Sequence, residues 1–342
     1  MIEVIKPGLL TLFQDSGRPG FAHLGVGRSG AFDEPALQIA NALCGNPRDV
    51  CALEITLAGP CLRVREATCI AVTGAPIPFR IDGVEQPMWA PVPVPAGALI
   101  ELGSMRRGCR NYLAVRGGFD VAPVLGSRST DVNAGLGPNC GRPLRNGDTL
   151  PAGSGSFFRR SRRADEKAGE NEFGPVPDPI SKRGRPTWWI DPRPWFGQET
   201  QQPLRLLPGK HLDALTEASR EALFSGMFRV HADSNRTGLR LDGPALECAR
   251  PIEMISEGCV PGLLQLPPSG RPIAFGPECP VSGGYPRIGQ IAAVDIPRLA
   301  QLRPGDAVRF MPCTFEDARH ALRKRERMLD TLTANIATRL AP

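Results

Sequence analysis

Polar residues that could bind and activate a small ligand gather in three glycine-rich stretches. The first runs from Gln14 to Gly20 and is followed by Ser29–Asp33. It places an acid–base pair, Asp15 and Arg18, and the carboxylate of Asp33 among glycines that let a backbone approach a ligand closely. The alternative is a turn held by a structural Asp–Arg pair, because polar clusters are common in turns.

The second stretch combines arginines and hydroxyls on short loops, at Arg116–Phe119, Leu125–Thr130 and Gly141–Arg142. Its candidate ligand-binding side chains are Ser127 and Arg142. Arginine forks and hydroxyls on glycine-rich loops suit a carboxylate or a phosphate. A run of hairpin turns is the alternative interpretation.

The third stretch lies in the second half of the chain and begins with the run Ser-Asn-Arg-Thr-Gly at 234–238. Glu257, Gln265 and the turn Gly283–Pro286 follow it. Tyr285 in that turn could donate a hydrogen bond to a substrate carbonyl or merely cap a core, since tyrosine does both.

The elements that must position these residues are mostly short strands. The 38 glycines and 36 prolines interrupt many brief apolar runs, which is typical of an all-β or β-rich fold. The expected strands include Ile70–Val72, Val92–Val94, Tyr112–Val115, Leu204–Leu207, Met227–Ala232, Gly238–Leu241, Leu263–Leu266 and Ala307–Phe310. We therefore predict a mainly β protein of two barrel-like halves with few helices.

Two helices stand out from the apolar spacing. The first is predicted from Glu34 to Leu43, with Asp33 as its cap and Pro35 in its first turn. The second is predicted from Phe315 to about Leu340, with Thr314 and Asp317 forming a cap. Its apolar stripe comprises Phe315, Ala318, Leu322, Leu329, Leu332 and Ile336.

The chain is therefore divided into four parts. Residues 1–152 are predicted to form an N-terminal β-rich domain and 188–313 a C-terminal β domain, followed by the helix at 314–342. Residues 153–187 are rich in Gly, Ser, Arg, Glu and Pro without apolar periodicity, which predicts a linker or surface insertion.

Composition excludes several classes of protein. No run of 18 apolar residues could cross a membrane, and the start lacks a secretory signal, so we expect a cytoplasmic protein. The ten cysteines form no C-x-x-C pair, which argues against structural zinc and predicts mostly buried, reduced thiols. A net charge of +6 without an aromatic stacking pattern gives no case for nucleic acid. Neither a P-loop nor a nucleophile elbow is present.

An ordered series of motifs resembles the C-subunit family of 5-oxoprolinase, long called allophanate hydrolase subunit 2. The series is similar to part of the carboxyltransferase region of urea amidolyase, and it covers nearly the whole chain outside 153–187 and the C-terminal tail. Its most specific members are Gln14-Asp15-x-Gly17-Arg18, Gly30-Ala31-x-Asp33, Leu125-Gly126-Ser127-x-Ser129-Thr130, Ser234-x-Arg236-x-Gly238 and Gly283-Gly284-Tyr285-Pro286.

The resemblance implies a cyclophilin-like β-barrel character, two partners that are the B and A subunits of 5-oxoprolinase, and ATP-driven opening of 5-oxoproline to glutamate. Two alternatives stay open. One is a biotin-dependent carboxyltransferase component acting on urea or a similar small amide. The other is a non-catalytic regulator that binds a B-subunit homologue, itself an inhibitor of a kinase.

The chain departs from the family pattern at two motifs. Where the family reads Asp-Arg-Gln-Thr-Thr before Gly-Gly-Tyr-Pro, this chain has Glu278-Cys279-Pro280-Val281-Ser282. Where it reads Ser-Asp-Arg-Met-Gly, this chain has Ser234-Asn235-Arg236-Thr237-Gly238. A changed substrate, or retained partner binding without catalysis, is compatible with these changes.

The chemistry assigns each candidate a role in a pocket expected between the two halves or at a subunit interface. A lactam is a poor electrophile, so phosphorylation of its oxygen by ATP, with or without Mg²⁺, would make its carbon open to attack by water. Charge neutralisation is assigned to Arg18, Arg142 and Arg236. Acid–base work or metal-ion ligation is assigned to Asp15, Glu257 and Glu278, although no resident metal site is predicted. Tyr285 and Gln265 would orient a carbonyl, and Asp33, Ser127 and Asn235 would help to bind substrate or phosphate.

Overall fold

The computed structural model describes residues 1–152, 188–196 and 202–341. The predicted linker at 153–187 lies outside the described residues. Contacts divide the chain into two compact units. Unit 1 comprises residues 1–16, 34–195 and 329–342, and unit 2 comprises residues 17–33 and 196–328.

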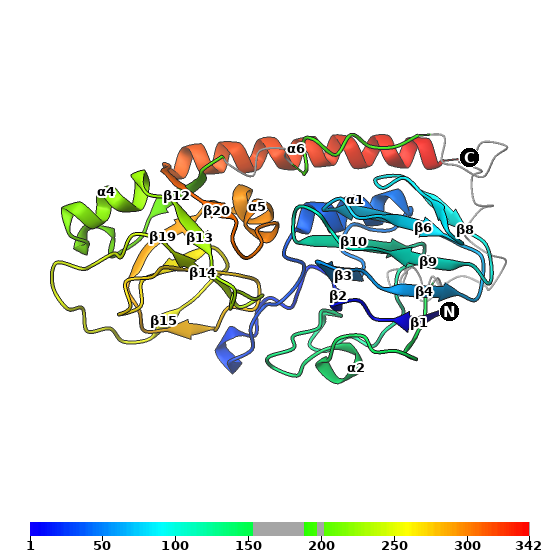
Figure 1. The fold of residues 1–342 in the computed structure, drawn as a ribbon, viewed down its shortest axis with the longest axis horizontal. Coiled ribbons are helices and arrows are strands. Elements are labelled where there is room, and N and C mark those ends of the chain that lie inside the picture. Colours follow the sequence, from blue (N-terminus) through cyan, green and yellow to red (C-terminus); the bar gives the residue numbers. More distant parts are fainter. Residues whose placement is uncertain (153–187, 197–201, 342) are drawn as a thin grey trace, which may run out of the picture. The chain divides into compact units, whose positions relative to one another are not determined.

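Unit 1 is built on two antiparallel sheets (Figure 1). The six-stranded sheet has the order β11-β1-β4-β9-β6-β7, and the five-stranded sheet has the order β2-β3-β10-β5-β8. The strands are β1 Ile2–Lys6, β2 Leu10–Gln14, β3 Ala52–Thr56, β4 Cys61–Val64, β5 Thr68–Gly74, β6 Phe79–Ile81, β7 Val84–Glu85, β8 Val92–Val94, β9 Leu99–Leu102, β10 Arg110–Val115 and β11 Thr149–Leu150.

Helix α1, Glu34–Leu43, packs on β5 and β10 of the five-stranded sheet, and Figure 1 shows it beside β10. It begins and ends where the apolar spacing predicted. Ile39 and Leu43 are fully buried, and the Thr73 hydroxyl of β5 donates to the Ala36 carbonyl at 2.7 Å. The helix therefore buries one apolar face against the sheet and adds a polar tie to it.

A buried ionic group lies between β3 and β10. Tyr112 donates to Glu54 Oε2 at 2.7 Å, and Arg110 Nε lies 3.4 Å from Glu54 Oε1. Their exposed fractions are 0–4%. Pairing Tyr112 opposite Glu54 in the ladder brings these side chains together. No motif in the local sequence indicated this group.

Unit 2 is organised around a near-closed β-barrel of eight strands with the order β20-β13-β14-β17-β16-β19-β12-β21. The two edge strands, β20 and β21, follow each other in the chain. β20 pairs with β13 at one edge of the sheet, and β21 pairs with β12 at the other. This architecture confirms the mainly β, barrel-like prediction. The strands are β12 Leu204–Pro208, β13 Phe228–Val230, β14 Gly238–Asp242, β16 Leu263–Gln265, β17 Ile273–Phe275, β19 Arg287–Ile291, β20 Ala307–Val308 and β21 Phe310–Pro312.

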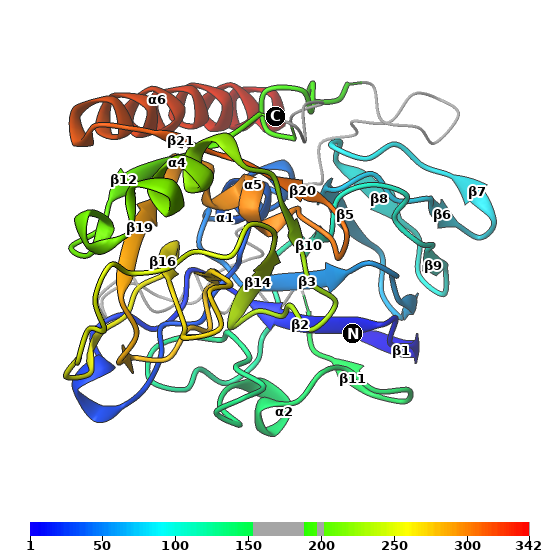
Figure 2. The ribbon, with the colours of Figure 1, turned by 60° about the vertical axis from the view of Figure 1, so that its left-hand side comes forward.

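Further elements of unit 2 surround the barrel, several of them labelled in Figure 2. β15 (Glu257–Gly258) pairs with β18 (Ser282–Gly283) in a separate two-stranded sheet. Helix α4, Glu217–Ser225, was not predicted, although Thr216 caps it by accepting from the Ser219 N–H at 3.1 Å. The other short helical segments of unit 2 are α5 Ile296–Ala300 and the 3₁₀ turns η1 Ala22–Leu24, η2 Leu212–Ala214 and η3 Ala293–Asp295, and unit 1 has the short α2 Pro138–Gly141.

Helix α6, Phe315–Leu340, is continuous and matches the predicted C-terminal helix. Thr314 caps it, because its hydroxyl accepts from the Asp317 N–H at 3.1 Å and donates to the Asp317 carboxylate at 2.6 Å. Ala318, Leu329 and Ile336 of the predicted stripe are buried, but Phe315 is 69% exposed and lies outside it. No helix in the described ranges is long and apolar enough to cross a membrane.

Replacement of a barrel-core phenylalanine should destabilise unit 2 strongly. Phe228 is fully buried and packs on Phe310 with ring centroids 5.8 Å apart. Phe228→Ala should lower the free energy of unfolding by about 3–5 kcal/mol, because it loses transfer free energy and leaves a cavity. Phe315→Ala is the matched control and should change it by less than about 0.5 kcal/mol. Denaturant unfolding measures both, and equal effects would contradict this view of the core.

Candidate functional site

A buried ion pair holds the segment at residues 17–33 to the barrel of unit 2. Arg236 immediately precedes the turn residue Thr237 before β14, and Glu278 follows β17. Arg236 Nε donates to Glu278 Oε1 at 2.6 Å, and Arg236 Nη2 donates to the Gly30 carbonyl at 2.7 Å. Both charged side chains are at most 5% exposed. Arg236 and Glu278, two predicted site residues, therefore form one charge-compensated group.

Other contacts hold the same segment. Phe32, 1% exposed, belongs to the barrel core, and Gln301 Nε2 donates to Asp33 Oδ2 at 2.7 Å. Gly276 is needed here, because a Cβ on it would lie 2.2 Å from the Arg236 carbonyl oxygen. Arg18, 1% exposed, donates its backbone N–H to the Arg28 carbonyl at 2.8 Å. Asp33, Arg236 and Glu278 therefore meet in one region of unit 2.

A second charged group of unit 2, here called the Glu257 cluster, comprises Lys210, His211, Glu257 and Arg287. Lys210 Nζ lies 2.9 Å from Glu257 Oε1, and Arg287 Nη2 lies 3.2 Å from Glu257 Oε2. The hydrogen bond from Lys210 lowers the pKa of Glu257, so this carboxylate is ionised at neutral pH. Two cations around one carboxylate leave a net positive charge for an anionic ligand.

The turn after β12 assembles this cluster. The Gly209 backbone passes so close to β19 that an added Cβ would lie 2.4 Å from the Arg287 carbonyl oxygen. The His211 N–H then donates to that same carbonyl at 2.9 Å, and the Arg287 N–H donates to His211 Nδ1 at 3.1 Å. The close approach thus places Lys210 and His211 against the first residue of β19.

The Arg287 side chain retains donors for a ligand. Its Nε and Nη2 are buried and have no hydrogen-bond partner within residues 1–152, 188–196 and 202–341. The 3.2 Å contact of Nη2 with Glu257 is an ion pair whose geometry falls short of a hydrogen bond. A planar guanidinium whose donors are not all hydrogen-bonded suits a carboxylate or a phosphate.

His211 is a neutral imidazole with a defined tautomer. Because Nδ1 accepts a backbone N–H, the proton resides on Nε2. Burial lowers the pKa of His211 and the neighbouring charge of Lys210 lowers it further, while Glu257 opposes them. At neutral pH the side chain can therefore donate a hydrogen bond from Nε2, as a carbonyl or phosphate oxygen requires.

Gln265 and Tyr285 come from the adjoining elements. Gln265, 2% exposed, directs Nε2 toward Cys259 Sγ at 3.7 Å. Gly283, which pairs with Glu257 across β15 and β18, leaves room for this amide, since a Cβ there would lie 2.9 Å from it. Tyr285 is 46% exposed, so its phenol is open to solvent or a partner.

The remaining candidates have contacts that stabilise turns and loops. Asn235 Oδ1 accepts from the Thr237 N–H at 2.8 Å in the turn before β14. In unit 1, Asp15 accepts from the hydroxyls of Ser127 and Ser129, each at 2.6 Å. It also accepts from the Arg128 N–H, so the loop at 127–129 surrounds this carboxylate.

Arg142 forms a two-bond pair with Asp148, with both N–O distances at 2.8 Å. This pair lowers the pKa of Asp148. The guanidinium of Arg142 thus stabilises the turn that leads to β11. No group of three or more His, Cys, Asp or Glu side chains suited to a metal ion occurs in the part of the chain that the structure describes.

Sequence reasoning missed Lys210, His211 and Arg287. Lys210 and His211 follow a Pro-Gly turn signal directly after an expected strand, and Arg287 follows the Gly-Gly-Tyr-Pro turn. Their position as charged residues next to such turns was the signal in the sequence that could have identified them as site candidates. Their meeting with Glu257 depends on pairing between distant strands, which the local sequence does not show.

Known proteins share this architecture. The model for the carboxyltransferase domain, subdomain A and B, matches residues 24–312. The chain is 35% identical to the 5-oxoprolinase C subunit of Escherichia coli and 30% identical to that of Haemophilus influenzae, covering 97% of each chain in both cases. It is 30% identical to urea amidolyase of Saccharomyces cerevisiae over 93% of this chain but only 17% of that protein.

A solved structure agrees with the sequence relatives. The crystal structure of Kluyveromyces lactis urea amidolyase matches with a TM-score of 0.81 and 29% identity, over 96% of this chain and 20% of that one. The fold and the family match thus define a carboxyltransferase-type domain. The chain belongs to the carboxyltransferase-domain family that includes the C subunit of 5-oxoprolinase.

Removing one charge of the buried pair should destabilise unit 2. Glu278→Gln leaves Arg236 buried without its counter-ion, which should cost about 3–5 kcal/mol of unfolding free energy. Asp213→Asn is the matched control, because its ion pair with Arg220 is solvent-exposed and should contribute less than about 1 kcal/mol. The double variant Arg236→Met with Glu278→Leu should recover part of the loss. Equal effects of the two single variants in denaturant unfolding would contradict the assignment.

The pKa of His211 should lie below its ordinary value of 6.5 and respond to its two charged neighbours in opposite directions. Lys210→Met should raise it, and Glu257→Gln should lower it. Because the folded pKa is depressed, the stabilising contribution of neutral His211 is full above about pH 6.5 and is lost as the pH falls through the folded pKa. NMR titration of the imidazole measures these shifts. A pKa above 6.5 in the unsubstituted chain would refute the neutral tautomer.

Proposed function

We propose that this chain is a subunit of an ATP-dependent 5-oxoprolinase-type amidohydrolase that opens 5-oxoproline to glutamate together with homologues of the B and A subunits of 5-oxoprolinase. The observation that carries the proposal is the Glu257 cluster. It combines a buried guanidinium with uncommitted donors, an ammonium group and a neutral imidazole beside one ionised carboxylate. This set of charges suits a small anionic amide and a developing phosphate.

The chemistry assigns a role to each member of the cluster. The Arg287 guanidinium binds the substrate carboxylate in a two-bond arrangement. His211 Nε2–H donates to the lactam oxygen, and Lys210 neutralises charge when the γ-phosphoryl group of ATP is transferred to that oxygen. Phosphoryl transfer releases ADP. Water then attacks the ring carbon and the C–N bond breaks, which leaves an acyl phosphate on the opened chain. A second water molecule hydrolyses this acyl phosphate to glutamate and phosphate. Glu257 holds Lys210 and Arg287 in position.

The comparisons support this choice of substrate class. Both 5-oxoprolinase C subunits are matched over nearly the whole of their length, whereas the urea amidolyase of S. cerevisiae is matched over 17% of its length. The ten cysteines are free thiols, which suits a reducing cytoplasm. ATP and any accompanying Mg²⁺ enter as reaction components of the complex, with Lys210 and Arg287 able to contact phosphate oxygens.

A second candidate function is carboxyl transfer from biotin to urea or a similar amide. The observation that favours it is the similarity to urea amidolyase, with a TM-score of 0.81 for the K. lactis structure. The same cluster would then bind the amide, and a biotin carrier on another chain would deliver the carboxyl group. The two functions differ in their products, since only the first releases glutamate.

Replacement of Arg287 should impair the hydrolysis while leaving the complex assembled. The chain is co-purified with its B- and A-subunit homologues, and glutamate release from 5-oxoproline is followed with and without ATP. Arg287→Gln should lower kcat/KM by about tenfold to a hundredfold, because a hydrogen bond to a charged group contributes about 1.5–3 kcal/mol. Arg271→Gln is the matched control, since Arg271 pairs with Asp242 on the surface.

The outcomes separate the alternatives. ATP-dependent release that requires this chain and falls only in Arg287→Gln supports the proposal. An assembled complex without release rejects 5-oxoproline as the substrate. Carboxylation of urea by a complex that contains biotin carboxylase and a biotin carrier would favour the second function instead. Assembly with the B-subunit homologue alone, without either activity, would indicate the regulatory alternative.

A further inference from the structure

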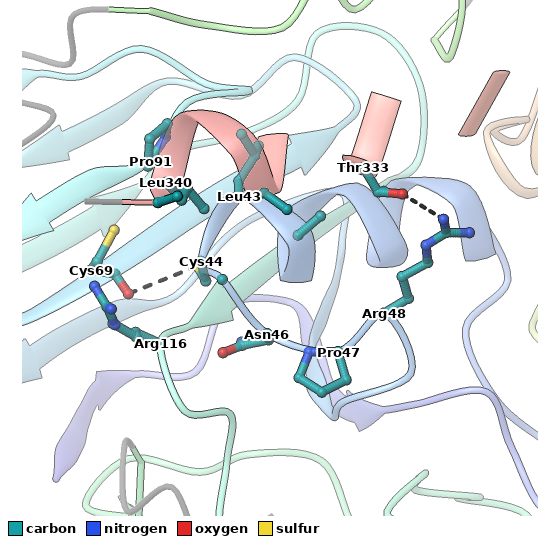
Figure 3. A pocket seen from close by; sticks show the side chains of 14 residues that line it. Leu43, Cys44, Asn46, Pro47, Arg48, Cys69, Pro91, Arg116, Thr333 and Leu340 are labelled. Atoms are coloured by element: carbon teal, nitrogen blue, oxygen red, sulfur yellow. Dashed lines mark hydrogen bonds between the residues drawn. The ribbon is translucent and has the colours of Figure 1, made fainter. Parts of the chain in front are cut away.

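A cavity of about 440 Å³ in unit 1 lies apart from the Glu257 cluster. It is formed by the last turn of α1, the turn at 45–48, the start of β5, the end of β10 and the last turns of α6 (Figure 3). All fourteen lining residues belong to unit 1. Gly45 and Pro47 of the lining are exposed, so the cavity meets the solvent beside the end of α1. A small solute therefore has a path to its inner wall.

Two cysteines lie together on that wall. Cys44 follows the last residue of α1, and Cys69 is the second residue of β5. Cys44 Sγ lies 3.8 Å from the Cys69 carbonyl oxygen, and the two thiols also hydrogen-bond to each other. Figure 3 draws both among the lining side chains. The two residues are 3% and 4% exposed, so the cavity is their route to solutes.

The fold sets the contact between the two thiols. Cys69 is held in β5, where it pairs with Pro93 of β8. The Cys44 N–H donates to the Asn41 carbonyl of α1 at 3.0 Å, and Cys44 Sγ lies 3.5 Å from the Ala114 carbonyl oxygen of β10. The packing of α1 on β5 and β10 therefore brings the thiols together and keeps them there.

The two thiols differ in acidity. The hydrogen bond from Cys44 lowers the pKa of Cys69, and the positive charge of Arg116 lowers it further, against the effect of burial. Burial raises the pKa of Cys44 well above its ordinary value, and the hydrogen bond with Cys69 raises it further. Because the thiolate is the nucleophile, Cys69 is the thiol that reacts first and Cys44 the thiol that stays protonated.

We propose that Cys44 and Cys69 form a reversible disulfide when hydrogen peroxide enters the cavity. The Cys69 thiolate attacks one peroxide oxygen, the O–O bond breaks, and Cys69 becomes a sulfenic acid. The other oxygen leaves as hydroxide and takes up the proton that Cys69 gave up. The Cys44 thiol then attacks the Cys69 sulfur, the S–O bond breaks, and water leaves with the Cys44 proton. Two thiols and one peroxide thus give one disulfide and two water molecules.

The surroundings suit this reaction. A disulfide needs its sulfurs at about 2.05 Å. The two thiols start in hydrogen-bond contact, and the cavity leaves space in which their short side chains can rotate. The bond would tie the end of α1 to β5, two elements that already pack together. The site shares no residue with the Glu257 cluster, so it is independent of the proposed hydrolase reaction.

The test uses the full chain, first reduced and then treated with an equimolar amount of hydrogen peroxide. The remaining thiols are alkylated with iodoacetamide, and the unreduced peptides are analysed by mass spectrometry. A cross-linked peptide pair that contains Cys44 and Cys69 should appear with time. Dithiothreitol should then restore both thiols, because it reduces a disulfide but not a sulfinic or sulfonic acid.

Cysteine variants test the order of the two steps. Cys44→Ser should leave Cys69 as a sulfenic acid, which dimedone traps. Cys69→Ser should leave Cys44 as a thiol and give about tenfold less dimedone adduct, since its pKa is raised. Cys61→Ser is the matched control, at a half-buried cysteine of β4 outside the lining, and should form the cross-link at the normal rate.

A second pair of variants tests access through the cavity. Ala337→Trp should fill the cavity and slow the cross-link by about tenfold, because oxidation of a thiol depends on its exposure to the oxidant. Ala334→Trp, at an exposed position of α6 outside the lining, should leave the rate unchanged. Both changes lie at exposed helix positions, so both chains should fold.

Three results would each overturn the inference. They are absence of the cross-link, a cross-link that forms as fast in Ala337→Trp as in Ala334→Trp, and equal dimedone adducts in the two serine variants Cys44→Ser and Cys69→Ser. If the serine variants do not fold, as judged by circular dichroism, the unsubstituted chain and the tryptophan pair decide, because the cross-link is then measured with both cysteines in place.

Discussion

The ion pair between Arg236 and Glu278 is the constraint on which the arrangement of unit 2 depends. Two charges at most 5% exposed are costly to remove from water, and their mutual contact and the bond to the Gly30 carbonyl help to compensate them. That bond draws the segment at 17–33 onto the barrel, where Phe32 enters the core. The carboxylate at 278 is thus tied to folding as well as to the family motif. Its longer side chain, compared with the aspartate of the family pattern, still reaches Arg236 at 2.6 Å.

The Glu257 cluster differs from this ion pair, because its charges are not balanced. Its carboxylate is 35% exposed, its cations exceed its anions, and Arg287 keeps buried donors without a hydrogen-bond partner among the described residues. A fully compensated pair such as Arg236–Glu278 has little charge to offer a ligand, whereas an unbalanced group does. The neutral His211 fits this setting, because nearby Lys210 opposes a second positive charge. The distribution of charge in unit 2 therefore separates a structural pair from the group that we propose to bind a ligand.

Unit 1 uses its polar motif residues differently. Asp15 receives hydrogen bonds from two serines and a backbone amide, and Arg142 is committed to Asp148. These contacts order loops whose backbone groups are not paired with a strand of either sheet. The same residue types that suit catalysis also satisfy buried backbone groups, so their presence in a motif does not decide between the two uses. Where they serve structure, a ligand must be bound by other side chains.

The sequence by itself determined the mainly β class, α1 at Glu34–Leu43, the capped helix α6 and the family, because periodicity, caps and ordered motifs are local signals. It also predicted Arg236, Glu278, Glu257 and Gln265 as site residues, and that assignment stays a prediction. Only the tertiary structure decided which of them meet. Arg236 joins Glu278 across 42 residues, and Lys210 joins Glu257 across 47. The physical reason is that strand pairing and a close backbone approach at Gly209 set these distances, and neither is encoded within a short stretch of residues.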